Sequence, residues 1–162
     1  MRAILVPIDF SVGSLAALAT ADKLGEALGY SVTLLHVVRQ LSAVLQPDAS
    51  LDPAIAGLAS GGLYDDEAAV ERARVQMTQF LARAPETRRP RQVIFRTGVP
   101  SDAIVDAANA VHAEMIVMST HGRRGLSRVF LGSTAEEVVR KSDVPVLTVK
   151  PPSSMNPNAL LT

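Results

Sequence analysis

Short apolar runs alternate with segments of helical periodicity along most of the chain. The runs are rich in valine, isoleucine and leucine, and each has the length of a buried β-strand. We predict strands over residues 3–8, 31–38, 92–96, 114–118 and 144–149.

The segments between these runs carry apolar residues three and four positions apart, as on one face of a helix. The first helix is expected to begin at a cap formed by Ser11 or Ser14 and to end at Gly29. Further helices are predicted over 65–83, after Pro100, and over 133–141. The expected apolar faces are Ala17, Ala21, Leu24 and Leu28 in the first helix, Val70, Ala73, Met77, Phe80 and Leu81 in the second, and Ile104, Val105, Ala108 and Val111 in the third.

The alternation of strand and helix predicts a doubly wound α/β fold, a parallel sheet with helices on both faces. Such folds bind ligands at the carboxyl ends of strands, where the strand order reverses. Residues 7–11 and 118–136 would flank this crevice if the first and fourth strands are neighbours, which the alternation alone does not fix. Residues 39–64 have no clean period and predict an irregular excursion, and the tail 151–162 is expected to be poorly ordered.

Composition and charge narrow the class of protein. The 16 basic and 16 acidic residues balance, so no strong electrostatic footprint for nucleic acid is present. The absence of cysteine excludes disulfides, zinc–thiolate sites and thiol catalysis. No signal-peptide pattern and no uncharged apolar run of the roughly 18 residues that span a bilayer is found. We therefore expect a cytoplasmic protein that binds neither nucleic acid nor membranes.

The segment from Met118 to Glu136 combines glycines and hydroxyl residues between a strand and a helix. Backbone N–H groups at such a junction, together with the helix dipole, favour an anion such as a nucleotide phosphate. The segment matches neither G-x4-G-K-[ST] nor G-x-G-x-x-G. A second interpretation needs no ligand, because Ser133 and Glu136 fit a capping box and Gly122 and Gly125 fit turns. Spacing alone leaves both interpretations open.

The histidines and the arginine run suggest less chemistry. His36 lies within a predicted strand and is expected to be packed, and His112 can complement the dipole at a helix end. His121 lies in the candidate loop, but one histidine does not make a metal site. The arginines of residues 88–91 are expected to lie in a solvated loop.

Several ordered motifs resemble those of the universal stress protein family, in its UspA-like, nucleotide-binding branch. That branch carries G-x2-G-x9-G-[ST] after the fourth strand, and this chain reads Ser119-x2-Gly122-x9-Gly132-Ser133. The resemblance runs from about residue 2 to residue 150 and omits the irregular excursion, and it implies one universal stress protein domain over residues 1–150. Its other motifs are Val6-Pro7-Ile8-Asp9-Phe10-Ser11, Leu35-His36-Val37, Gly98-Val99-Pro100 and Val144-Pro145-Val146-Leu147-Thr148-Val149.

The resemblance implies strand order 3-2-1-4-5, as in adenine nucleotide alpha hydrolase-like folds, and a bound ATP, with or without Mg²⁺. It also implies a homodimer through the last strand, Val144 to Val149. Serine replaces the first motif glycine at Ser119, which bears on ATP affinity. The implied contacts are Pro7, Ile8 and Asp9 at adenine and ribose, the Val37 backbone at adenine, Met118 near the nucleoside, and Ser119, His121, Gly122, Gly132, Ser133 and Thr134 at the phosphates.

Three functions stay open at this point. The first is a regulatory ATP binder of the stress response. The second is a slow ATP hydrolase or phosphotransferase, for which His121, Asp9 and nearby arginines are the candidates and no catalytic residue is assigned. The third is a dimerisation module whose nucleotide site has lapsed, which Ser119 favours and Gly122, Gly132 and Ser133 oppose.

Overall fold

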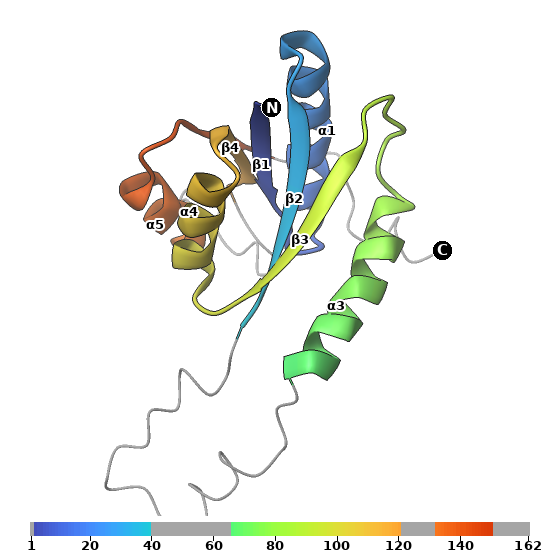
Figure 1. Ribbon diagram of the computed structural model, residues 1–162, viewed down its shortest axis with the longest axis vertical. Helices are drawn as coiled ribbons and strands as arrows, with labels where there is room; N and C mark the ends of the chain where they lie inside the picture. Colours follow the sequence, from blue (N-terminus) through green and yellow to red (C-terminus); the bar gives the residue numbers. More distant parts are fainter. Residues whose placement is uncertain (1, 40–65, 121–131, 151–162) are drawn as a thin grey trace, which may run out of the picture.

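The strands form one parallel sheet in the order β3-β2-β1-β4-β5. The computed structural model describes residues 2–39, 66–120 and 132–150. The expected strand order is confirmed, and β1 lies between β2 and β4 (Figure 1). The strands are β1 (Ala3–Pro7), β2 (Ser31–Val38), β3 (Arg91–Thr97), β4 (Ala113–Ser119) and β5 (Val146–Val149).

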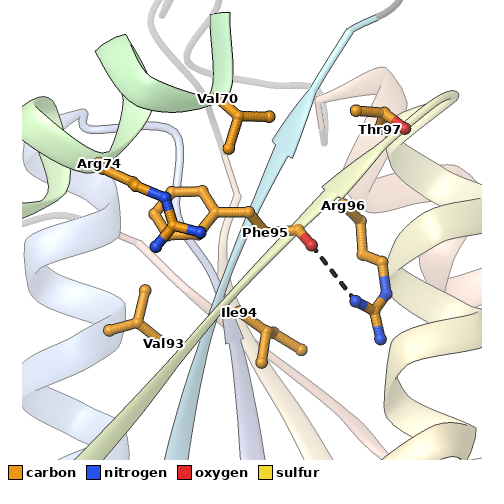
Figure 2. Close-up of a pocket in the computed structure, with 7 residues that line it drawn as sticks. All are labelled: Val70, Arg74, Val93, Ile94, Phe95, Arg96 and Thr97. Carbon is orange, nitrogen blue, oxygen red and sulfur yellow. Dashed lines mark hydrogen bonds between the residues drawn. The ribbon is translucent and has the colours of Figure 1, made fainter. Parts of the chain in front are cut away.

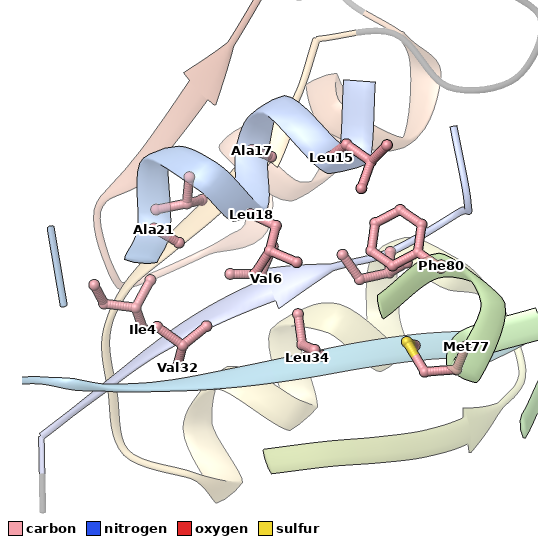
Figure 3. Packing of buried hydrophobic residues seen from close by; sticks show 12 residues of the cluster. Ile4, Val6, Leu15, Ala17, Leu18, Ala21, Val32, Leu34, Met77 and Phe80 are labelled. Carbon is pink, nitrogen blue, oxygen red and sulfur yellow. The ribbon is translucent and has the colours of Figure 1, made fainter. Parts of the chain in front are cut away.

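Helices cover both faces of the sheet, as the alternating pattern predicted. The helices α1 and α3 pack with Ile4 and Val6 on one face, while α4 and α5 pack with Leu5 on the other. Figure 3 shows the first of these two cores. No helix within the described residues is long and apolar enough to cross a membrane. The helices are α1 (Val12–Leu28), α3 (Asp66–Leu81), α4 (Pro100–Ala110) and α5 (Ser133–Lys141).

The ends of α1 follow the sequence signals. The Ser11 side chain accepts a hydrogen bond from the Ser14 amide, and Gly29 ends the helix with φ 77°. Glycine adopts this left-handed conformation without steric cost. One expected core residue is wrong, because Leu28 is 49% exposed in the last turn, which projects beyond the sheet (Figure 1).

The last strand begins two residues later than predicted. Pro145 lacks an N–H to donate, and the Val144 amide donates to the Ser142 hydroxyl at 3.2 Å instead of joining the sheet. Ladder pairing therefore begins at Val146, which is in register with Ile116 of β4. β5 forms the edge of the sheet.

One residue of the arginine run is not solvated, which corrects the sequence-based expectation. Arg91 donates to both carboxylate oxygens of Asp22 in α1, at 3.2 and 2.6 Å, and to the Pro85 carbonyl at 2.7 Å. Both side chains of this ion pair are only 12% exposed. The pair fixes the start of β3 against α1.

Candidate functional site

The strand order reverses between β1 and β4, which are parallel neighbours. The chain leaves β1 toward β2 and β3 on one side and leaves β4 toward β5 on the other. In doubly wound folds, ligands bind at the carboxyl ends of two such neighbouring strands. The structure thus supplies the adjacency on which the predicted crevice depends.

The loop after β1 is organised by Asp9. Its Oδ1 accepts hydrogen bonds from the Ser11 amide at 3.1 Å and from the Ser14 hydroxyl at 2.5 Å. The Asp9 amide donates to the same Ser14 oxygen at 3.1 Å. Asp9 therefore stabilises the start of α1, and its contact with a ligand stays a prediction.

His36 packs beside this loop, as expected for a histidine within a strand. Its ring centroid lies 4.3 Å from that of Phe10 and 6.3 Å from that of Phe95. Its Nδ1 lies 2.7 Å from the Ile8 carbonyl oxygen. The sequence analysis assigned no role to Phe10. This residue adopts φ 65°, an uncommon conformation for a bulky residue.

The start of α5 differs from the predicted capping box. Gly132 occupies the N-cap position with φ −61° and ψ 145°, and this glycine makes no side-chain capping bond. Ser133 is already the first helical residue, and the Glu136 amide donates to the Gly132 carbonyl at 2.9 Å. The capping-box interpretation is therefore wrong, because the cap lies one residue earlier than the Ser-x-x-Glu spacing requires.

The Gly132 amide already has a partner. It donates to the Thr120 carbonyl at 2.7 Å, and the Thr120 amide donates to the Val149 carbonyl of β5 at 3.0 Å. The Gly132 amide is therefore not available to a ligand, while the amides of Ser133 and Thr134 lie in the first turn, where helical N–H groups have no intrahelical acceptor.

The other predicted site residues lie in the core, in paired strands or outside the described residues. Ile8 and Met118 are 4% and 6% exposed and belong to cores on opposite faces of the sheet. Pro7 pairs with Leu35, Val37 with Arg96, and Ser119 with Val149. Those lying outside the described residues are His121, Gly122, Arg123, Arg124, Gly125 and Arg128. Within the described residues, no cluster of three or more histidines and carboxylates could hold a metal ion.

Polar contacts between α4 and α5 fix the position of the Glu137 carboxylate near the start of α5. Glu137 accepts a hydrogen bond from the buried Ser101 hydroxyl at 2.5 Å and lies 3.6 Å from Lys141 Nζ. This hydrogen bond first, and then the Lys141 charge, lower the pKa of Glu137 below its ordinary value of 4.5. Lys141 also binds Asp102 at 2.7 Å, which raises the pKa of Lys141. Glu137 is therefore held toward α4.

This arrangement makes the free energy of unfolding depend on pH. Because the pKa of folded Glu137 is lowered, its contribution is present above pH 4.5 and is lost as pH falls through the folded value. Ser101→Ala removes the main cause of the shift. We expect this variant to be less stable than the wild type at about pH 7 and to lose less stability on acidification to about pH 3.5. Urea unfolding followed by circular dichroism at both pH values checks this, and equal acid losses in the two proteins would contradict it.

A shallow groove lies between α3 and β3, at the edge of the sheet opposite to β5 (Figure 2). Its volume is about 370 Å³. The Arg74 guanidinium lies over the Phe95 ring, 5.0 Å from the centroid. None of its lining residues belongs to β1 or β4. Its lining residues are Val70, Arg74, Val93, Ile94, Phe95, Arg96 and Thr97.

Comparison with known proteins identifies the family. The profile of the universal stress protein family matches residues 1–150. The chain belongs to the universal stress protein family. It is 30% identical to universal stress protein MJ0577 of Methanocaldococcus jannaschii, over 92% of this chain and 94% of that protein. The solved structure of MJ0577 aligns with a TM-score of 0.73 at 27% identity, covering 94% of this chain and 98% of that one.

Two more distant structures of this family show the same fold with nucleotides bound. A universal stress protein in complex with cAMP aligns with a TM-score of 0.55 at 20% identity, covering 93% of this chain and 98% of that one. The universal stress protein of Archaeoglobus fulgidus in complex with dAMP aligns with a TM-score of 0.52 at 20% identity, with coverage of 93% and 98%. At this identity, both likenesses show the fold.

Proposed function

We propose that this universal stress protein is a stress-response regulator that binds ATP across the carboxyl ends of β1 and β4. The observation that carries the proposal is the position of the start of α5, where the Gly132 amide binds the Thr120 carbonyl directly after β4, beside the point where the strand order reverses. Helix N-termini favour anions, and ligands of doubly wound folds bind at such reversals. The cAMP and dAMP complexes support an adenine nucleotide by analogy of fold.

The proposed ligand lies between two groups of residues. Pro7, Ile8 and Asp9 follow β1 and would meet adenine and ribose, with Val37 offering backbone groups one strand away. Met118 would pack near the nucleoside. The amides of Ser133 and Thr134 would hold phosphates, together with Ser119, His121 and Gly122, and Gly132 would leave space for them. Any Mg²⁺ would be held by the phosphates of the bound ATP.

Equilibrium titration tests this function directly. The purified chain is titrated with ATP in the presence of Mg²⁺ by calorimetry, with GTP as the control for the base. We expect saturable binding of ATP at or below millimolar concentration and weaker binding of GTP. Absence of saturable binding at millimolar ATP would remove the proposed function.

Cytoplasmic location, expected from the sequence, stays a prediction.

We also propose that two copies pair along β5. In the ladder with β4, the carbonyls of Pro145 and Val149 accept from Ile116 and Thr120 at 2.9 and 3.0 Å. Because backbone groups alternate along a strand, the amides of Val146 and Thr148 face the open edge. Leu147, 40% exposed, adds apolar surface beside that edge. A short apolar edge strand favours pairing with another strand.

Thr148→Pro is expected to convert the dimer to a monomer. Proline removes the outward N–H at this position without removing a donor to β4, since edge strands tolerate proline where the N–H faces solvent. Sedimentation velocity of the wild type and variant measures the change. Thr148→Val is the control, because it keeps the amide and should remain a dimer. A wild type that sediments as a monomer, or a dimeric Thr148→Pro protein, would contradict this pairing.

A further inference from the structure

The loop after β1 contains a strained residue. Phe10 has φ 65°, in the left-handed region that bulky side chains rarely adopt. It directly follows Asp9, whose carboxylate organises the start of α1. Such strain persists only where surrounding contacts determine the conformation, and it is concentrated at functional sites. The contacts that hold this loop therefore bear on its function.

Two consecutive residues of β2 hold the backbone of Ile8. The Ile8 amide donates to the Leu35 carbonyl at 2.7 Å. The Ile8 carbonyl lies 2.7 Å from His36 Nδ1, and because a carbonyl only accepts, Nδ1 carries the hydrogen. The backbone N–H and the backbone carbonyl of Ile8 are thus both hydrogen-bonded to β2. The last residue before Asp9 is consequently fixed in position by one side chain and one backbone carbonyl.

The His36 ring also supports Phe10. Their centroids are 4.3 Å apart with planes inclined by 31°. Phe10 meets Phe80 edge-on at 6.0 Å, and His36 meets Phe95 edge-on at 6.3 Å. The imidazole is held between two aromatic rings, so its orientation toward Ile8 is set by packing.

We propose that His36 is a positioning residue that holds residues 8–10 in the conformation required by the nucleoside end of the bound nucleotide. The inference rests on the proposed function. It assigns two separable contacts to one side chain, a hydrogen bond to Ile8 and ring packing against Phe10. Neither contact requires His36 to touch the ligand.

A pair of substitutions separates these contacts. His36→Phe keeps a ring against Phe10 but removes the N–H that binds the Ile8 carbonyl. His36→Asn loses the ring but places an amide nitrogen as many bonds from the backbone as Nδ1. We expect His36→Phe to weaken ATP binding by about fivefold, in line with the net value of one hydrogen bond. His36→Asn should recover at least half of that loss on a logarithmic scale. His112→Asn is the control, because His112 is exposed and asparagine tolerates its left-handed backbone, φ 49°, and it should bind ATP as the wild type does.

Amide exchange tests the positioning without a nucleotide. The Ser11 and Ser14 amides are held by Asp9 and Ser11 oxygens, so they report on the loop. We expect both to exchange faster in His36→Phe than in the wild type or His36→Asn, while the urea midpoint changes little. Unchanged exchange in His36→Phe would overturn the inference, as would ATP affinity equal to that of the wild type. If the wild type binds no ATP, the proposed function fails, and amide exchange still decides whether His36 holds the loop.

Discussion

Arg91→Ala is expected to lower the free energy of unfolding by about 3 kcal/mol, the low end of the range for removing one partner of a buried ion pair. The variant leaves the Asp22 carboxylate, 12% exposed, without its two charge-assisted hydrogen bonds. It also leaves the Pro85 carbonyl without the Arg91 donor. Urea unfolding at about pH 7, followed by circular dichroism because the chain has no tryptophan, measures the loss.

The neighbouring arginine supplies the control. Arg88 is exposed, and Arg88→Ala should change the free energy of unfolding by no more than about 0.5 kcal/mol. Arg91→Lys should fall between the two, because lysine keeps the charge but cannot form the two-pronged contact. Equal stabilities of the Arg88→Ala and Arg91→Ala proteins would show that the ion pair adds nothing measurable.

Gly132→Val is expected to weaken ATP binding by about a hundredfold, or about 2.7 kcal/mol. The branched side chain would occupy space beside the Ser133 and Thr134 amides and displace phosphate from them. Loss of one or two charge-assisted hydrogen bonds has this magnitude. The Gly132 backbone, at φ −61° and ψ 145°, accepts valine without strain, so the fold should persist.

Calorimetric titration with ATP and Mg²⁺ measures the effect, and circular dichroism confirms that the variant is folded. Gly132→Ala provides the graded comparison, with an intermediate loss, because a single methyl group obstructs less. A folded Gly132→Val protein that binds ATP as tightly as the wild type would place the phosphates away from the start of α5.

The sequence predicted most of the fold because each strand is a local apolar run. The order of the strands could not be predicted from this pattern, because alternation does not say which strands are neighbours and only the family resemblance implied the contact of β1 with β4. The role of Arg91 was also out of reach, since its partner Asp22 is 69 residues away along the chain. Around Arg91, the local sequence resembles a solvated loop.

The candidate site shows the same division between local and distant information. Ser-x-x-Glu fits a capping box, but the hydrogen bond from Gly132 to Thr120 fixes where the helix begins. That hydrogen bond joins residues 12 positions apart in the chain, so the spacing of residues near the helix does not predict it. Packing of His36 followed from its strand, whereas its bond to Ile8 depends on the register that sets Pro7 opposite Leu35.

Thr120 links the edge strand to the start of α5. Its N–H donates to the carbonyl of Val149 in β5, and its carbonyl accepts from the amide of Gly132 at the N-cap of α5. Assembly along that edge and occupancy by a nucleotide would therefore act on the backbone of the same residue. Under thermodynamic linkage, any change in subunit affinity caused by the nucleotide is matched by an equal change in nucleotide affinity on assembly.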